Sequence, residues 1–196
     1  MLTIRTAKSD DAGQIAPLIN LIIDEMQLEE LEDIPEPGLE KVITMAYRTR
    51  TYLSDKATTV VAEANGQVVG VAFGYPGENE EAVDRVLENL SAKSNDFDEP
   101  MTFDSETNGN EWYLDSIAVS PDYQGHGVGS QLLRALPEYA KADDESVIGL
   151  NVDFENPDAM KLYGRHGFEV VGKRMIGDHE YYHMQKQVDN RATIKL

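Results

Sequence analysis

The sequence contains no cysteine. Without thiols there can be no disulfide framework, no thiol nucleophile and no zinc site with cysteine ligands, and nothing in the composition requires an oxidising compartment. Long hydrophobic runs are also absent, because no apolar stretch approaches the roughly 20 residues of a membrane-spanning helix. The N-terminal residues MLTIRTAKSDDAG have no apolar signal core behind their positive charge. We therefore expect a soluble, cytoplasmic protein with no membrane partner.

Positive charge is scarce. The chain has 17 Lys and Arg residues against 36 Asp and Glu residues, a formal net charge of −19. Such a field repels a polyphosphate backbone, so we expect no nucleic acid as a partner. The same field attracts cations, which favours an amine substrate, although the solubility of an acidic protein explains the charge equally well.

The length and composition predict one domain. The 196 residues, of which 41% are hydrophobic, are enough for a substantial core. We expect a single domain over residues 1–188, with an acidic insert at 76–110 inside it and a C-terminal tail at 189–196. The sequence has no internal repeat.

Hydrophobic periodicity predicts the order of the elements. Helices are expected from a cap at Ser9-Asp10-Asp11 to Met26, and then near 38–49, after a polar, mobile link in which Pro35 and Pro37 should break the helical path. Asn65-Gly66 predicts a β-hairpin between Val-rich strands at 58–64 and 67–75. Further strands are expected at 2–5, 112–119, 147–152, 168–173 and 180–188, and further helices at 82–90, after Gly129 with a kink at Pro137, and at 156–165.

The stretch YQGHGVGSQLL, residues 123–133, leads from a strand into a helix through three glycines. Such a turn can aim backbone N–H groups at an anion, with the positive end of the helix dipole behind them. A Walker loop is excluded because its second glycine and its lysine are missing. The dinucleotide fingerprint is disfavoured, since Ser130 occupies its third glycine position and too little chain follows for a doubly wound sheet.

Two motifs together carry a family resemblance. Gln124, Gly127 and Gly129 fill the pattern of Gln or Arg, two residues, Gly, one residue, and Gly or Ala. Downstream, NPDAMKLYGRHGF, residues 156–168, supplies the family's Asn, Ala, Leu-Tyr and Gly-Phe in order. The chain resembles the GNAT superfamily of acetyl-CoA-dependent N-acetyltransferases. The resemblance is firm over 112–171, whereas the insert at 76–110 departs from the family's usual short connection.

The resemblance implies an α/β (α+β) fold: a mixed, mostly antiparallel sheet of six to seven strands flanked by helices, with an extra helical insert between the third and fourth strands. It also implies that acetyl-CoA is the co-substrate and that no metal is needed. The pyrophosphate would lie on the backbone of the glycine turn, and the pantetheine arm would pair with the fourth strand. The implied cofactor-binding residues are Ile117, Ala118, Val119, Gln124, Gly125, His126, Gly127, Val128, Gly129, Ser130, Asn156 and Tyr163.

The resemblance further implies that Tyr163 is the general acid that protonates the departing thiolate. From the sequence alone, Tyr163 could equally fill the core, and Asn156 before Pro157 could be a helix cap that needs no ligand. A carboxylate base is also needed. Some family members carry one on the strand at 149–152, but Asn151 cannot serve, so Glu111, Asp115 and Asp153 remain as candidates, each of which could instead be an exposed charge at a strand end.

Residues 179–183, HEYYH, match the zinc-protease pattern. That pattern needs a helix, in which the two histidines lie one turn apart. Here the aromatic run after Gly177-Asp178 predicts a strand, which would separate His179 from His183 by roughly 13 Å. A metalloprotease is therefore an alternative that we disfavour.

The sequence leaves several functions open. We expect acetyl transfer to the primary amine of a small molecule or peptide, and the acidic segments at 24–40 and 78–111 favour a cationic acceptor. A non-catalytic coenzyme A sensor is the alternative. Whether the insert lines the acceptor site or forms a homodimer contact stays open.

Overall fold

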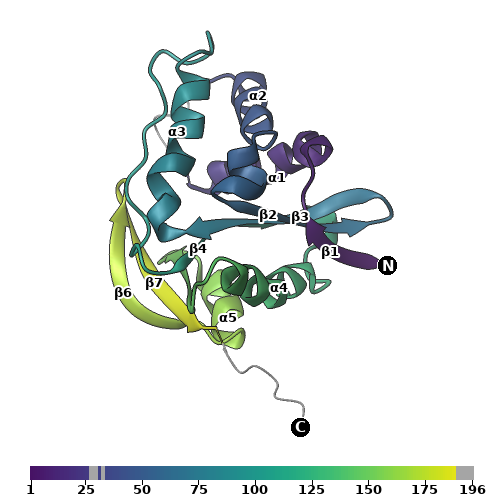
Figure 1. Cartoon of the computed structure of the whole chain (residues 1–196), viewed down its shortest axis with the longest axis vertical. Coiled ribbons are helices and arrows are strands. Elements are labelled where there is room, and N and C mark those ends of the chain that lie inside the picture. The colour runs from purple at the N-terminus through teal and green to yellow at the C-terminus, as the bar shows by residue number, and fades with distance from the viewer. Residues whose placement is uncertain (27–30, 32–33, 189–196) are drawn as a thin grey trace.

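The computed structural model describes residues 1–26, 31 and 34–188 of the chain. Its centre is a seven-stranded sheet in the order β1-β2-β3-β4-β5-β7-β6 (Figure 1). Every neighbouring pair is antiparallel except β4 and β5, which run parallel. The predicted fold class, a mostly antiparallel mixed sheet of six to seven strands flanked by helices, is confirmed.

The strands lie close to their predicted positions. The hairpin between β2 and β3 turns at Asn65 and Gly66, whose φ angles of 53° and 79° explain the choice of residues. The seven strands are β1 (Leu2–Thr6), β2 (Thr58–Ala64), β3 (Gln67–Pro76), β4 (Trp112–Val119), β5 (Val147–Asp153), β6 (Glu169–Ile176) and β7 (His179–Gln187).

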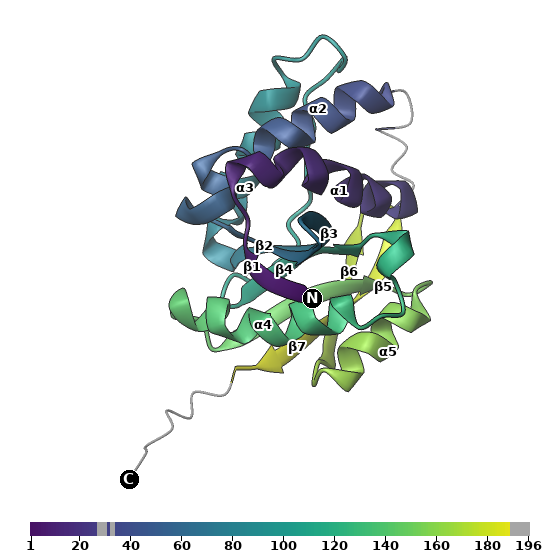
Figure 2. The same ribbon diagram turned by 90° about the vertical axis from the view of Figure 1, so that its right-hand side faces the viewer.

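The helices form one layer on each face of the sheet. Figures 1 and 2 show α1, α2 and α3 on one face and α4 and α5 on the other. The helices are α1 (Ala12–Met26), α2 (Glu36–Ala46), α3 (Glu80–Ser91), α4 (Val128–Ala142) and α5 (Pro157–Arg165), with 3₁₀ turns at Ser9–Asp11, Gly77–Asn79 and Pro121–Tyr123 and a π-helical turn at Thr51–Asp55.

The expectation that Pro37 breaks a helix was wrong. Helix α2 begins at Glu36, with Pro35 at its N-cap and Pro37 in its first turn. Proline is tolerated there because the first N–H groups of a helix have no intrahelical acceptor to lose. Most of the predicted mobile link before α2, and the tail at 189–196, lie outside the described residues. Helix α4 continues through Pro137, and the kink expected there stays a prediction.

The side chains of β4 alternate between two cores. Tyr113 points into the core under α1, α2 and α3, whereas Trp112 and Leu114 point into the core under α4 and α5. Trp112 is fully buried, and its indole N–H donates to Asp143 Oδ2 at 2.9 Å. The sheet therefore separates two compartments, and the side chains from Trp112 to Leu114 enter them in turn.

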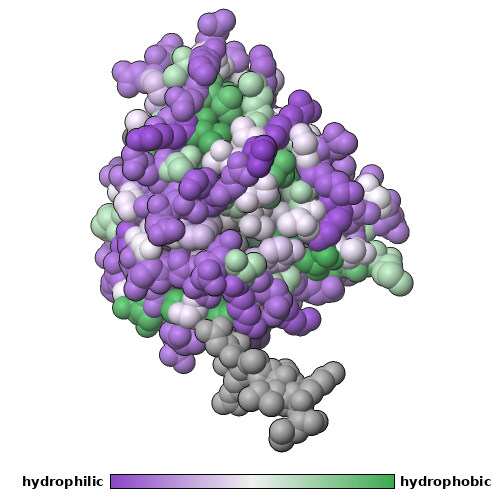
Figure 3. Space-filling model, in the orientation of Figure 1, coloured by the Kyte–Doolittle hydropathy of each residue, from purple (hydrophilic) through white to green (hydrophobic). Residues whose placement is uncertain are grey.

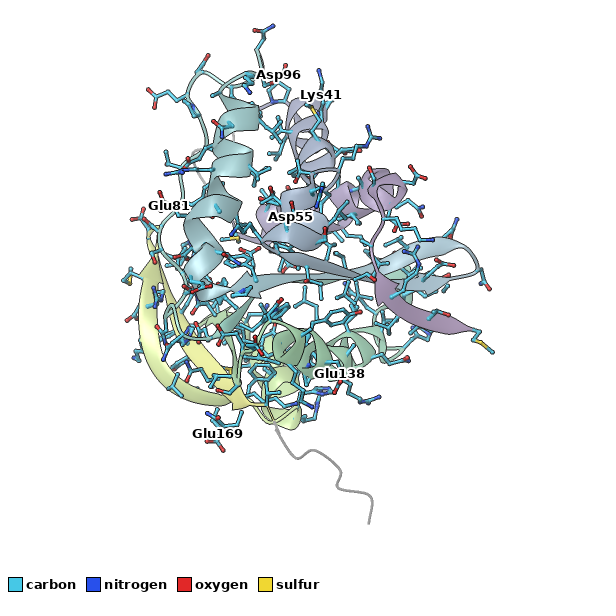
Figure 4. The ribbon with its side chains drawn as sticks, viewed as in Figure 1. Lys41, Asp55, Glu81, Asp96, Glu138 and Glu169 are labelled. Atoms are coloured by element: carbon cyan, nitrogen blue, oxygen red, sulfur yellow. The ribbon has the colours of Figure 1, made fainter. Side chains whose placement is uncertain are left out.

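The acidic insert is held against the rest of the fold. After α3 the chain has no helix or strand until β4, and Figure 1 shows this segment running back past β6 and β7. Phe97 is buried in the core that includes α2, and a Cβ added to Gly38 of α2 would lie 2.6 Å from Asp96 Cβ. Asp96 and Lys41 are labelled at this end of the molecule in Figure 4.

The visible surface is mostly polar. Figure 3 shows hydrophilic residues over most of one face, with an apolar area near α2 and α3. Over the part of the chain that the structure describes, no helix combines the length and the apolar character needed to cross a membrane.

Gly74 makes the packing of Trp112 testable. A Cβ at this position would lie 2.3 Å from the Trp112 ring, so we expect Gly74→Ala to lower the free energy of unfolding by about 1–3 kcal/mol through overpacking. Gly172→Ala is the matched control, because this strand glycine has nothing within 4 Å of the added Cβ. Urea unfolding of both variants measures the difference, and equal stabilities would contradict the packing argument.

Candidate functional site

The two parallel strands of the sheet separate soon after they meet. Strand β4 pairs with β5 only at Trp112 with Ile148 and at Tyr113 with Gly149. From Leu114 onwards β4 remains paired with β3 on its other side, so the edge that faces β5 has no strand partner. Backbone groups on such an edge are free to bind an extended ligand. We call this divergence the fork.

The glycine turn places a row of free amides at the start of α4. None of the backbone N–H groups from Gly125 to Ser130 donates to another described residue. Gly125 and Gly127 adopt φ angles of 74° and 79°, which a residue with a side chain rarely adopts. These six amides, next to a helix N-terminus, have the geometry and the chemistry to hold a pyrophosphate.

The side chains of the turn stabilise it from within. Gln124 Nε2 donates to Val119 O at 3.2 Å, and His126 Nδ1 lies 2.8 Å from Gln124 O. Val128, the first residue of α4, is buried, whereas the Gln124 and His126 side chains are exposed. The turn is thus attached to the end of β4, where Ile117, Ala118 and Val119 form the open edge of the fork.

Helix α5 lies beside this turn. Asn156 Oδ1 accepts from Ala159 N at 3.1 Å, which confirms the predicted helix cap. His166 Nε2, just after α5, lies 3.0 Å from Ser130 Oγ of α4. The cap and this contact fix α5 against the N-terminal turn of α4.

Tyr163 of α5 belongs to the core on the α4 and α5 face. Its ring packs edge-on against Phe168, and its side chain is 9% exposed. The hydroxyl has no hydrogen-bond partner among the described residues. Burial, assisted by the charge of Glu25, raises the pKa of Tyr163 to about 12, so the hydroxyl keeps its proton at neutral pH. Such a group can donate a proton but is a poor base.

Asp115 lies at the fork on the strand that the two compartments share. The register between β3 and β4 shifts at Gly74 and Phe73, which pair with Leu114 and Ser116 and leave Asp115 as an extra, bulged residue. Its side chain keeps exposed surface and accepts from Ser116 Oγ at 2.6 Å and from Tyr75 OH at 3.3 Å. The surrounding protein nevertheless desolvates the carboxyl and raises its pKa.

The insert adds two carboxyl groups that the sequence did not single out. Burial, followed by repulsion from Asp115, raises the pKa of Asp84 to about 7 and the pKa of Glu106 to about 8. Glu80, on the same helix as Asp84, adds to the repulsion. No motif could have indicated this, because only the folded insert brings these carboxyl groups near β4.

Glu111 is placed differently. It is fully buried, and its carboxylate accepts from Asn108 N at 2.9 Å, His183 Nε2 at 2.9 Å and Gln185 Nε2 at 2.7 Å. Burial alone would raise its pKa, but these hydrogen bonds outweigh burial and lower it. Gly149 leaves the space, since a Cβ there would lie 2.0 Å from Glu111 Oε2. Catalysis by Glu111 stays a prediction, and this geometry disfavours it.

The two histidines of HEYYH lie on β7, as the predicted strand requires. His179 pairs with Asp153 at 3.3 Å, whereas His183 Nδ1 contacts Asn151 Oδ1 at 2.6 Å and His183 Nε2 contacts Glu111. Asn151 uses its amide nitrogen as a donor elsewhere, so its Oδ1 must accept from His183. Both ring nitrogens of His183 are thus already in contact with side-chain oxygens, and neither is free to bind a metal. No cluster of three metal-binding side chains occurs within residues 1–26, 31 and 34–188.

The structure thus distributes the predicted residues over the two faces of the sheet. The amides of 125–130 and Tyr163 lie on the side of α4 and α5, while Asp115 neighbours Tyr75 and the carboxyl groups of the insert. Asp153 lies at the end of β5, paired with His179, and Glu111 is enclosed between β5 and β7.

Comparisons with known proteins agree with this geometry. Residues 23–168 match the family described as the acetyltransferase (GNAT) family. The uncharacterized N-acetyltransferase YhfO of Bacillus subtilis is 25% identical over 169 residues, which are 86% of this chain and 90% of YhfO. The N-alpha-acetyltransferase RimI of Mycobacterium tuberculosis is 41% identical over 64 residues, which span 33% of this chain but only 39% of RimI.

Solved structures share the whole arrangement. A crystal structure described as an acetyltransferase is 40% identical, with a TM-score of 0.82 over 95% of this chain and 100% of that chain. A Salmonella typhimurium protein, yncA, solved with its cofactor acetyl-CoA, shares the fold at 20% identity and a TM-score of 0.63, over 98% of this chain and 96% of that chain. The forked sheet, the glycine turn and these matches lead to one conclusion: the chain belongs to the GNAT family of N-acetyltransferases and is an acyltransferase.

Proposed function

We propose that this acyltransferase moves the acetyl group of acetyl-CoA directly onto the primary amine of a small molecule or a peptide. The observation that carries the proposal is the fork, with free amides and a protonated tyrosine on one face and accessible carboxyl groups on the other. No covalent enzyme intermediate is needed, since the fork lets both substrates meet.

Coenzyme A would bind along β4 and the glycine turn. The pyrophosphate would accept hydrogen bonds from the amides of 125–130, and the pantetheine arm would pair with the open edge at 117–119. Gly129 leaves room for close approach, because a Cβ there would have only Leu162 and Val119 nearby, both at 3.8 Å. Asn156, already occupied as a cap, would contact the cofactor from the start of α5.

Tyr163 would act as the general acid. Departure of coenzyme A leaves a thiolate, and a neighbouring neutral hydroxyl can supply its proton. The raised pKa of Tyr163 keeps that hydroxyl protonated, and its lack of a described hydrogen-bond partner leaves it free to donate.

The acceptor would enter from the other face as a cation. Asp84, Glu106 and Asp115 form an acidic wall there, and their mutual repulsion would be relieved by a bound ammonium group. Of the bases predicted from the sequence, Asp115 is the one on this wall, yet both of its oxygens already accept hydrogen bonds. We therefore assign Asp115 the binding of the positive charge.

The amide row can be tested at Gly127. We expect Gly127→Ala to weaken coenzyme A binding about tenfold, or about 1.4 kcal/mol, because the turn must shift out of its left-handed conformation. Gly66→Ala is a matched control: both glycines have φ of 79° and nothing within 4 Å of an added Cβ. Both variants should lose about 1–2 kcal/mol of stability from strain. Calorimetric titration with coenzyme A should separate them, and equal affinities would argue against the cradle.

The acid can be tested by removing one oxygen. We expect Tyr163→Phe to lower kcat by about 10²-fold or more while the affinity for coenzyme A stays nearly unchanged, because the hydroxyl acts in the step that expels the thiolate. Tyr139→Phe on α4 is the control for loss of a tyrosine hydroxyl beside the same core. Steady-state kinetics measures the difference. A normal kcat for Tyr163→Phe would mean that another residue, or water, is the acid.

The acceptor class can be tested with a panel of amines. Polyamines, aminoglycosides and peptide N-termini should be acetylated faster than neutral or acidic amines, and added salt should raise the KM for the cationic ones by screening the acidic wall. Release of free thiol from acetyl-CoA measures the rates. Turnover of only neutral or acidic amines would refute the cationic acceptor, and coenzyme A binding without any transfer would favour a sensor.

A further inference from the structure

We propose that Glu106, contributed by the insert, is the general base that takes the proton from the acceptor amine. The inference deepens the proposed function and rests on it. Neither the glycine motif nor the downstream motif includes this residue, and no strand or helix contains it.

Glu106 is held by a hydrogen bond to Tyr113, the residue of β4 at which the fork opens. Tyr113 is the last residue of β4 that pairs with β5, and its hydroxyl lies 2.6 Å from Glu106 Oε2. No hydrogen bond reaches Oε1 from a described residue, and the side chain is only partly buried. One carboxylate oxygen is thus fixed beside the fork while the other is free to accept a proton.

A chain of hydrogen bonds determines the direction of that contact. Asn151 Nδ2 donates to Tyr113 OH and to Glu106 O, both at 3.0 Å. Because Tyr113 accepts from Asn151, its own proton is directed to Glu106. Asn151 is fixed in turn by His183, and His183 by Glu111. The buried Glu111 and His183 pair therefore orients the Glu106 carboxylate through two intermediate side chains.

The backbone around Glu106 is anchored on both sides. Glu80 Oε1 accepts from the N–H of Glu106 and, at 3.1 Å, from the N–H of Thr107. Arg174 of β6 donates to Ser105 O at 2.7 Å and to Thr107 O at 3.2 Å. An extended loop segment held in this way can present a side chain as reproducibly as a strand does.

Asp115 is the alternative base, and its contacts explain why we assign the proton to Glu106. Ser116 Oγ donates a hydrogen bond to Asp115 Oδ1, and Tyr75 OH donates one to Asp115 Oδ2. A carboxylate held by two donors is suited to bind a positive charge, whereas Glu106 retains an unoccupied oxygen. The two neighbouring carboxyl groups thus divide charge binding and proton removal.

The electrostatic surroundings match a base that works near neutral pH. Burial and then repulsion from Asp115 raise the pKa of Glu106 to about 8, against the hydrogen bond from Tyr113, which lowers it. The carboxyl therefore loses its proton as the pH rises through about 8, and base-dependent activity should appear over the same range. The charged or titratable groups around it are Tyr75, Glu80, Asp84, Tyr113, Asp115, Arg174 and Tyr181.

The proposed step balances in protons. The acceptor ammonium gives one proton to Glu106, and the amine nitrogen forms a bond to the thioester carbon. As the carbon–sulfur bond breaks, sulfur takes the proton of Tyr163. The nitrogen loses its second proton on becoming an amide, and this proton restores Tyr163. The proton on Glu106 leaves to solvent, so the products are the acetylated amine, coenzyme A and one proton.

The test is the pH dependence of Glu106→Gln in the full chain. We expect kcat/KM to fall about 10²-fold near pH 7.5, with unchanged coenzyme A affinity, because glutamine keeps the shape of the side chain but accepts no proton. The deficit should shrink at high pH, where the amine arrives already deprotonated. The pH profile of kcat/KM should be measured with two acceptors whose amine pKa values differ. The part of the profile that is due to Glu106 should lie at the same pH for both acceptors, whereas the part due to the substrate amine should move with the amine pKa.

Two further variants keep the test decisive. Glu99→Gln removes an exposed carboxylate from the same insert and should behave as wild type. Glu106→Asp keeps a carboxylate on a side chain that is one methylene shorter. This variant should recover part of the activity, and its kcat/KM should again rise with pH, even if the glutamine variant folds poorly. Wild-type rates at every pH in Glu106→Gln would overturn the assignment while leaving the acetyltransferase proposal intact. A wild-type protein that acetylates no amine would overturn both.

Discussion

The constraint on which the site depends is that β4 and β5 are parallel neighbours that pair over only two residues. A sheet normally satisfies the backbone groups of its inner strands, and here one edge of β4 is left open in the middle of the molecule. The open edge leaves backbone groups of β4 free to pair with an extended ligand. In the proposed function, the fork would let Tyr163, from one face, and an acceptor bound near Asp115, from the other, reach the same thioester.

The insert and the β6–β7 hairpin are joined by hydrogen bonds, and in the proposed function they would form the acceptor side together. Arg174 of β6 binds the segment at 105–108, and Gly177 N donates to Asp104 Oδ2 at 2.9 Å. The buried contact between Glu111 and His183 lies beneath this junction, and Asn108 N and Gln185 Nε2 also donate to the Glu111 carboxylate. A buried pair of this kind contributes little net stability, but it favours one arrangement over others. That arrangement orients Asn151, Tyr113 and Glu106.

Much of the fold could be predicted because local rules and tertiary packing agree. Asn65-Gly66 predicted a hairpin, and Asn156 with Pro157 predicted a helix start. The aromatic run after Gly177-Asp178 predicted a strand, although its residues match the zinc-protease pattern. The error at Pro37 came from reading proline only as a breaker, although a first helical turn accepts it. The π-helical turn at Thr51–Asp55 carried no sequence signal that we identified.

The sequence by itself determined the glycine turn, which is the cofactor side in the proposed function. Gly127 and Gly129 specify a turn whose amides face outwards, and this depends on residues adjacent in the chain. The carboxyl groups of the proposed acceptor side were brought together only by tertiary structure. Glu106, Asp84 and Asp115 come from a loop, a helix and a strand, and their pKa values rise because folding removes water and brings like charges together. Glu111, a plausible base in the sequence, became a buried partner of His183 for the same reason: contacts between segments far apart along the chain set the environment of each carboxyl group.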